Sequence, residues 1–231
     1  MTEHEFTLAD RIAKIKSINE KYDLENNAYV SFSGGRDSTV LHYLMDEALP
    51  GNKIPRVFIN TGIEYKATLK FVREMMANDD RFTIWTVGKN IKKTLDTVGW
   101  PFKSKEHSQK LYEWKHGAKS KSHQKYFRII PDGYAVCPKV LMYQAEPNFN
   151  LNISHKCCFE FKKKPIQLYQ KQSGRSIVLT GMVREEGGQR NNINCVVTTK
   201  EGALKKFHPL APVTSEWEDW YIKEKYIKLR L

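Results

Sequence analysis

The sequence predicts an α/β fold built on a mostly parallel, five-stranded sheet with helices on both faces. The first reason is alternation, because segments dense in β-branched and aromatic residues take turns with segments whose apolar residues recur at helical spacing. Strands joined through helices form right-handed crossovers, which lay the strands parallel and cover both faces of the sheet. The second reason is the glycine pair Gly34-Gly35, which stands between the first strand and the next helix, where such folds bind ligands.

The expected strands and helices follow in order along the chain. A first helix is indicated by Leu8, Ile12, Ile15 and Tyr22, with Thr7 and Asp10 as its start signal. The five expected strands are 28–33, 54–60, 81–87, 176–181 and 193–199. An amphipathic helix follows each of the first two strands, and a last helix begins at about Ser215, where Ser215 and Glu218 fit a capping box.

The middle of the chain is irregular. Residues 100–160 are basic and aromatic, and prolines and glycines interrupt them repeatedly. No repeat, low-complexity tract or linker separates them from the rest of the sequence. We therefore expect one domain over residues 1–231, with an irregular basic insertion at about 100–160.

Composition excludes several classes of protein. With 40% hydrophobic residues, the 231-residue chain is not disordered, and no apolar run approaches the roughly 18 residues of a membrane helix. The N-terminus has no apolar signal-peptide core, so we expect a cytoplasmic protein without a membrane partner. Lys and Arg (38) outnumber Asp and Glu (26), and the net charge of +12 favours anionic partners such as nucleotides and nucleic acids.

Half of that net charge falls in one basic stretch, residues 103–128. The stretch contains eight Lys or Arg residues and two Glu residues, and four aromatic residues lie between them: Tyr112, Trp114, Tyr126 and Phe127. Aromatic rings can stack on bases while lysines follow phosphates, so the stretch is a candidate surface for single-stranded nucleic acid. A solvated basic loop explains the same residues about as well.

The loop after the first strand carries the chemistry, with the sequence Ser33-Gly34-Gly35-Arg36-Asp37-Ser38-Thr39. Glycines permit positive φ and close backbone approach to phosphate oxygens, and the following helix adds the partial positive charge of its N-terminus. Ser33 and Ser38 can donate hydroxyls, Arg36 supplies a forked cation, and Asp37 could hold Mg²⁺. An ordinary strand–helix turn with a capping Asp or Ser is the plainer alternative. The loop is neither the Walker loop nor the dinucleotide fingerprint.

This loop closely resembles the S-G-G-x-D-S pyrophosphate loop of the adenine nucleotide α-hydrolase-like superfamily, the PP-loop ATP pyrophosphatases. Further segments resemble, in the same order, the phosphoadenosine phosphosulfate (PAPS) reductase-like family: 60–64 with Asn60-Thr61-Gly62, 154–165 with Cys157-Cys158, 181–190 with Gly181-Met182, and 208–222 with Trp217 and Asp219. The resemblance covers most of 28–222 and implies the Rossmann-like adenine nucleotide α-hydrolase fold. Arg36 stands where the family usually has lysine. Arginine keeps the positive charge, but its planar, forked guanidinium replaces the compact ammonium group of lysine.

The resemblance also implies a site for Mg²⁺-ATP, or for adenosine phosphosulfate (APS) or PAPS in its place. The nucleotide would contact a set of residues in three loops: Ser31, Ser33, Gly34, Gly35, Arg36, Asp37, Ser38, Thr39, Asn60, Thr61, Gly62, Gly181 and Met182. The catalytic candidates are Arg36, Asp37, Arg184, Arg190, Cys157 and Cys158. Taken alone, Arg184 and Arg190 flank a glycine-containing loop and suit a clamp on phosphate or sulfate, whereas two solvent-exposed arginines are the alternative.

The four cysteines leave several alternatives open. Adjacent Cys157 and Cys158 do not readily form a disulfide with each other, so they indicate metal binding, redox chemistry or simple burial. In the resembling iron–sulfur members such a pair joins a later C-x-x-C around a [4Fe–4S] cluster, and this sequence has no C-x-x-C. A cluster on Cys137, Cys157, Cys158 and Cys195 is therefore an alternative that we do not favour. Lys162, Lys163 and Lys164 would favour thiolate character nearby, so Cys157 or Cys158 could carry sulfur.

Three functions follow from these patterns. The first is an ATP pyrophosphatase and sulfurtransferase, in which an acceptor oxygen attacks the α-phosphate of Mg²⁺-ATP and sulfur later displaces the adenylate. The second is an APS or PAPS reductase, an oxidoreductase, against which the lack of a thiol after Cys195 argues. The third is a non-catalytic module that binds nucleotide or nucleic acid. The expected partner is an adenosine nucleotide, and a nucleic-acid acceptor, a sulfur-donor protein and a second copy in a homodimer are open alternatives.

Overall fold

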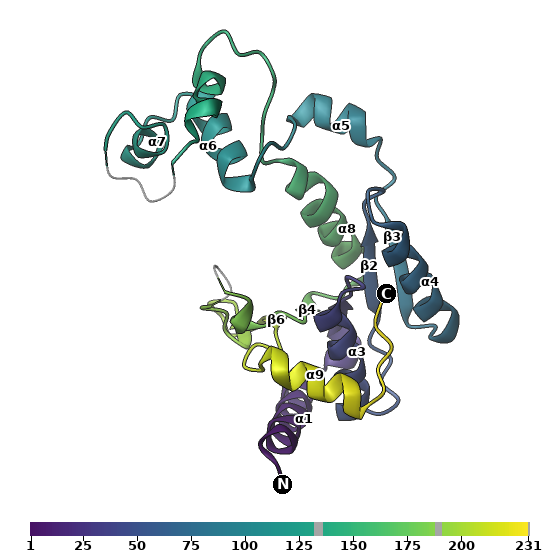
Figure 1. Ribbon diagram of the computed structural model, residues 1–231. Helices are drawn as coiled ribbons and strands as arrows, with labels where there is room; N and C mark the ends of the chain where they lie inside the picture. The colour runs from purple at the N-terminus through teal and green to yellow at the C-terminus, as the bar shows by residue number, and fades with distance from the viewer. Residues whose placement is uncertain (132–135, 188–190, 231) are drawn as a thin grey trace. The chain divides into compact units, whose positions relative to one another are not determined.

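The computed structural model describes residues 1–131, 136–187 and 191–230 (Figure 1). The chain divides into two compact units, the first made of Met1–Val87 with Ile166–Leu231 and the second of Gly88–Pro165. No described helix combines the length and the apolar character needed to span a bilayer.

The first unit contains a six-stranded sheet in the order β3-β2-β1-β4-β6-β5. Its strands are β1 (Ala28–Ser31), β2 (Arg56–Asn60), β3 (Phe82–Thr86), β4 (Ile177–Leu179), β5 (Val196–Thr198) and β6 (Leu204–Phe207). Neighbouring strands are parallel except for the edge pair β5–β6, which is antiparallel. The mostly parallel α/β sheet is thus confirmed, with six strands instead of five.

The missed strand is β6, whose burial pattern explains why the sequence did not indicate it. Leu204 and Phe207 are buried while Lys205 and Lys206 between them are exposed, so this short strand lacks the alternation of apolar and polar residues. It becomes a strand because it pairs with β4 on one side and with β5 on the other.

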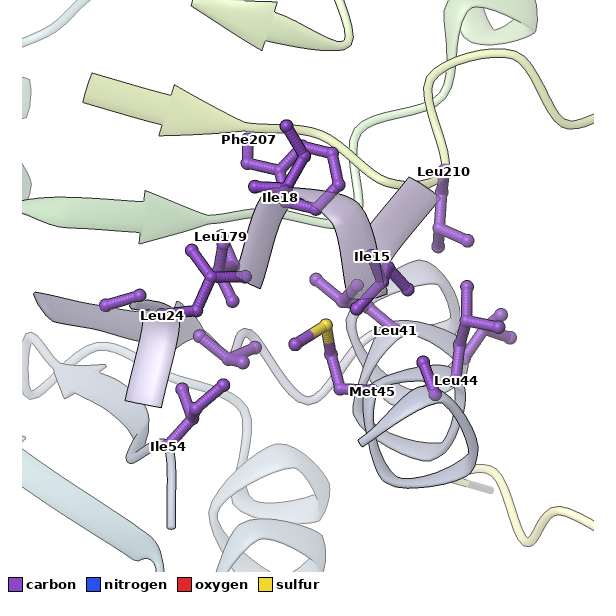
Figure 2. Close-up of a cluster of buried hydrophobic side chains, with 14 of the residues drawn as sticks. Ile15, Ile18, Leu24, Leu41, Leu44, Met45, Ile54, Leu179, Phe207 and Leu210 are labelled. Atoms are coloured by element: carbon purple, nitrogen blue, oxygen red, sulfur yellow. The ribbon is translucent and has the colours of Figure 1, made fainter. Parts of the chain in front are cut away.

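The helices of the first unit cover both faces of the sheet. They are α1 (Glu3–Tyr22), α2 (Leu24–Asn27), α3 (Arg36–Ala48), α4 (Lys66–Asn78), α8 (Lys164–Ser173), η3 (Arg184–Glu186, a 3-10 turn) and α9 (Ser215–Glu224). Val30 packs with α1 and α3 in the main core, which Figure 2 shows around Ile15, Leu41 and Leu179. The neighbouring Tyr29 points to the opposite face and packs against Tyr169 of α8. This alternation confirms a sheet covered on both sides.

The caps of two helices differ from the predicted ones, although the last helix begins at Ser215 as expected. The first helix begins at Glu3, because Thr2 caps it and Glu5 bonds back to the Thr2 backbone, so Thr7 and Asp10 lie inside the helix. The last helix is capped by Thr214, whose hydroxyl accepts the Trp217 N–H, and Ser215 is its first residue. Ser215 and Glu218 have the spacing of a capping box, but Ser215 lies one residue after the N-cap, Thr214.

The second unit is a set of short helices around its own small core. They are α5 (Ile91–Val98), α6 (Lys105–Lys115), α7 (Lys121–Tyr126), the 3-10 helix η1 (Lys139–Ala145) and the π-helix η2 (Phe159–Lys163). The expected insertion at 100–160 falls inside this unit, and the single domain stays a prediction. Tyr126 and Phe127 are buried in its core with Leu111, Cys137 and Ile153. Of the four aromatic residues proposed to stack on bases, these two are structural, because no base can reach a buried ring.

Candidate functional site

The loops singled out from the sequence lie at one edge of the sheet in the first unit. Strand β1 pairs in parallel with β2 on one side and with β4 on the other, so the carboxyl ends of all three strands are neighbours. The chain passes from β1 to β2 and returns later to β4, which makes the end of β1 a topological switch point. Ligands of open α/β sheets bind in the crevice at such a point.

The phosphate loop 33–38 has the backbone that its glycines predict. Gly34 has φ +71°, and a Cβ on it would lie 3.1 Å from Thr68 Cγ2 and 3.2 Å from Val72 Cγ2 on α4. A side chain there would therefore be strained and crowded at once. The Ser38 hydroxyl donates to the Gly35 carbonyl at 2.9 Å and lies 3.0 Å from the Ser33 hydroxyl, so the loop is braced before any ligand arrives.

The loop opens onto the N-terminus of α3. Gly35 is the N-cap residue, and within the described residues no side chain caps the helix. The first backbone N–H groups of a helix have no intrahelical acceptor and carry partial positive charge. The amides of Arg36, Asp37 and Ser38 are thus available to an anion, which suits a phosphate group.

The loop after β4 packs directly on the start of α3, and this contact requires a glycine. A Cβ on Gly181 would lie 2.5 Å from the Asp37 carbonyl oxygen and 3.0 Å from the Ser38 nitrogen. The contact joins two segments that are far apart in the sequence, and Met182, which follows Gly181, is half-buried. It is a direct physical link between the sequence motifs at 33–38 and 181–182.

Arg36 does not point freely into solvent, because α9 holds its guanidinium. Its Nε lies 3.2 Å from Glu218 Oε2, and its Nη2 lies 3.0 Å from Asp219 Oδ1 and donates to the Ser215 carbonyl at 2.6 Å. From the sequence, Glu218 was expected only as part of a helix cap and not as a residue of the site. No local pattern could have done so, since the pairing joins residues 182 positions apart along the chain.

Glu218 is an unusual carboxyl group, with only 3% of the residue exposed. Its pKa is raised to about 7, chiefly by burial and then by the nearby Asp37 carboxylate, while Arg36 opposes the shift. Glu218 Oε1 is buried without a hydrogen-bond partner among the described residues, and Arg36 Nε, although 3.2 Å from Glu218 Oε2, is not aligned for a hydrogen bond. Such atoms point to a proton, a cation or a ligand group that completes the site.

The loop after β2 forms a turn held by its own side chains. Asn60 Oδ1 accepts the Gly62 N–H at 3.0 Å, the Thr61 hydroxyl donates to Glu64 Oε1 at 2.7 Å, and Gly62 has φ +87°. The side-chain amide of Asn60 therefore acts as the start of an Asx turn. The residues lie at the edge of the sheet predicted for the nucleotide, and their contact with it stays a prediction.

The predicted arginine clamp is placed only in part. Arg184 is exposed at the start of η3, and its Nε donates to the Ile193 carbonyl at 2.7 Å, while Arg190 lies outside the described residues. The side chain of Glu185 in the same turn accepts the Ser215 N–H, which ties η3 to the start of α9. This second tie supports the helix end that holds Arg36.

The cysteines lie in different surroundings. Cys195 is in the first unit, 3.8 Å from Arg11 Nη1, whereas Cys137 is buried in the core of the second unit and Cys157 and Cys158 are half-buried there. Burial raises the pKa of the Cys137, Cys157 and Cys195 thiols. The expected thiolate character is wrong for Cys157, because burial outweighs the opposing charge of Lys162.

Within the described part of the chain, the group of potential metal ligands that lies close together contains no cysteine. His42, Asp46 and Asp79 offer atoms within 4.8 Å of one another. Arg56 and Arg81 already occupy the carboxylates, with Arg56 Nη2 2.6 Å and Arg81 Nη1 2.7 Å from Asp46 Oδ1. This group is a partly buried ion-pair network at the start of β2.

Known proteins agree with this architecture. Residues 27–230 match the family model described as the phosphoadenosine phosphosulfate reductase domain. An uncharacterized protein of Methanocaldococcus jannaschii is 33% identical over 103 residues, which is 41% of this chain and 25% of that protein. The chain thus covers a quarter of this relative's length.

Two solved structures share the fold. FMN adenylyltransferase of Candida glabrata superposes with a TM-score of 0.55 at 11% identity, over 100% of this chain and 60% of that chain. The NH3-dependent NAD synthetase of Campylobacter jejuni gives a TM-score of 0.50 at 13% identity, over 97% of this chain and 74% of that chain. At these identities the likeness shows the fold alone. The family match extends over nearly the whole chain, so the chain belongs to the phosphoadenosine phosphosulfate reductase domain family.

Proposed function

We propose that this protein is an enzyme that binds Mg²⁺-ATP at the phosphate loop and cleaves it to AMP and pyrophosphate, adenylating an acceptor for sulfur transfer. The observation that carries the proposal is the braced loop 33–38 with uncapped amides at the start of α3. A pyrophosphate leaving group carries several negative charges, and preorganised N–H donors at a helix N-terminus stabilise such charge as it develops.

The proposed reaction has two displacements. An acceptor oxygen attacks the α-phosphorus, and the bond to the β-phosphate oxygen breaks with its electron pair on pyrophosphate. A sulfur nucleophile then attacks the adenylated acceptor, and AMP leaves with the acceptor oxygen. The loop's part is to position the phosphates and to neutralise the leaving group.

The residues present fit a Mg²⁺ ion. This ion prefers oxygen ligands, and Asp37 and the unpartnered Oε1 of buried Glu218 are carboxylate oxygens beside the phosphate loop. When bound, the ion would neutralise phosphate charge. Arg36 opposes the effect of burial on the Glu218 carboxyl group, whose pKa is about 7, and a bound cation would favour its charged form.

The phosphate site is tested by a matched pair of glycine variants. Gly34→Ala places a Cβ against α4, whereas Gly51→Ala has nearly the same backbone, φ +76°, and its Cβ meets no described atom within 4 Å. Both variants are destabilised by an alanine at positive φ. They differ in that only the Gly34 variant also crowds the phosphate loop against α4. We expect ATP to raise the melting temperature of the wild type and of Gly51→Ala, and not of Gly34→Ala. Equal shifts in all three proteins would place the nucleotide elsewhere.

Turnover distinguishes the proposed reaction from its alternatives. Pyrophosphate release from ATP supports adenylation, and sulfite release from APS or PAPS would identify a sulfonucleotide reductase instead. The raised pKa of Cys137, Cys157 and Cys195 lowers their thiolate fraction, which disfavours reduction by these thiols. Nucleotide binding without either product would make the protein a binding module.

A further inference from the structure

The second unit contains a cavity that exposes one of the two adjacent thiols. Its volume is about 600 Å³. The residues that line it are Val98, Lys105, Gln109, His155, Lys156, Cys158, Phe159, Glu160 and Lys163, all within Gly88–Pro165. Cys158 belongs to this lining and Cys157 does not, so the cavity distinguishes two residues that the sequence leaves equivalent.

The local helix geometry explains why only one thiol faces the cavity. Cys157 and Cys158 form the first helical residues of the segment, and consecutive helical residues point about 100° apart. The π-helix η2 follows at once, with the Lys164 N–H bonded to the Phe159 carbonyl five residues back. Cys158 and Lys163, also five residues apart, both line the cavity. Single π-turns are rare in proteins and occur frequently at functional sites.

The cavity favours an anion. Lys105, Lys156 and Lys163 contribute three ammonium groups, and among the described residues neither Lys105 nor Lys163 has a carboxylate partner. Glu160, the one acidic residue of the lining, is already paired with Lys89 and with Lys164, the latter at 3.5 Å. The unopposed positive charge is therefore about two to three units, which suits a small dianion.

A buried polar atom on the same wall lacks a partner. His155 Nδ1 is buried and makes no hydrogen bond within the described residues, while its ring packs edge-on against Tyr112 at 5.9 Å. Lys156 Nζ is held 4.2 Å above that same Tyr112 ring. An unsatisfied buried polar group is costly, and a ligand oxygen in the cavity would satisfy it.

We propose that this cavity binds a small sulfur-bearing dianion of the thiosulfate class, and that Cys158 accepts its outer sulfur. The inference rests on the proposed function, because sulfur transfer to an adenylated acceptor needs a sulfur source. The Cys158 thiol loses its proton to solvent, and Sγ attacks the outer sulfur. The sulfur–sulfur bond of the donor breaks, its electron pair leaves on sulfite, and Cys158 becomes a persulfide. Total charge is conserved and no oxidant or reductant is needed.

The test uses the whole protein with sodium thiosulfate and without ATP. We expect up to one sulfite per chain and a 32 Da adduct (one sulfur) on Cys158, located by fragmentation of its peptide. The adjacent thiols provide matched variants: Cys158→Ser should abolish sulfite release, and the release should survive in Cys157→Ser. Sulfite from the Cys158→Ser protein, no sulfite from the wild type, or an adduct on another cysteine would each overturn the proposal.

The charge of the cavity is tested by alkylation of Cys158. The measured quantity is the ratio of the alkylation rates with anionic iodoacetate and neutral iodoacetamide, divided by the same ratio for a free thiol. We expect this preference to exceed one in the wild type, and the double change Lys105→Gln, Lys163→Gln should reduce it about tenfold. Lys110→Gln is the control, since Lys110 lies on α6 outside the lining and donates to the Ser122 hydroxyl. An unchanged preference in the double variant would refute an anion site. Both thiol assays are carried out without ATP. A negative result in them would therefore not contradict pyrophosphate release from ATP, and a lack of pyrophosphate release would not contradict sulfur binding by Cys158.

Discussion

The buried carboxyl group of Glu218 should make the stability of the protein depend on pH in a defined window. Its pKa is about 7 in the folded protein, compared with the ordinary value of 4.5 that applies to the unfolded chain. Burial raises the pKa most, and the carboxylates of Asp37, Asp219 and Glu185 raise it further than Arg36 lowers it. Between these two values the folded protein holds a proton that the unfolded chain has released. The contribution of Glu218 to the free energy of unfolding therefore falls by roughly 1.4 kcal/mol per pH unit as pH rises from 4.5 to 7.

The variant Glu218→Gln removes this dependence while keeping the shape of the side chain. Relative to wild type, it should gain about 3 kcal/mol between pH 4.5 and pH 8, since the whole shift of the pKa contributes at 3% exposure. The assay is urea unfolding followed by far-UV circular dichroism at pH 4.5, 6, 7 and 8. Glu216→Gln, at an exposed position of the same helix, should show no such gain. Parallel stability curves for wild type and Glu218→Gln over this range would refute the reasoning.

Three further perturbations test other parts of the structure. Gly181→Ala places a Cβ 2.5 Å from the Asp37 carbonyl oxygen, so it should lower the free energy of unfolding in urea by about 1–3 kcal/mol. It should also abolish the ATP-dependent rise in melting temperature, and an unchanged rise would contradict the contact. Asp46→Ala leaves fully buried Arg56 without its carboxylate partner and should destabilise by about 3–5 kcal/mol, and a loss below about 1 kcal/mol would show that the network is dispensable. The protein isolated in air should be nearly colourless and hold little iron, whereas about four irons per chain, lost in Cys157→Ala, would establish a cluster.

The sequence indicated the phosphate loop more completely than any other part of the site. The loop is local: a strand, two glycines and a helix start within about ten residues determine its backbone, and the structure has Gly34 at positive φ as expected. The strands β1 to β5 were predicted for the same reason, since dense apolar segments between turns are local signals. Strand β6 was missed because its pairing partners, and not its own alternation, make it a strand.

Side-chain partnerships over long sequence distances were not predictable. The sequence could not pair Arg36 with Glu218, place Gly181 against Asp37, or show that Tyr126 and Phe127 are core residues. Each of these facts depends on which surfaces meet after the sheet has formed. Nor could it separate Cys158, which lines a cavity, from Cys157, which does not.

By itself, therefore, the sequence determined the fold class, the family resemblance and the loop that can hold phosphate, because hydrophobic periodicity and glycine placement act over a few residues. Only the tertiary structure decided the electrostatic environment of that loop. The pKa of Glu218 and the orientation of Arg36 depend on burial and on charges that α3 and α9 bring together. Which of the two adjacent thiols lines the cationic cavity depends on a π-turn and on packing within the second unit. Burial and Coulomb interactions depend on distance in space, which the order of residues does not specify.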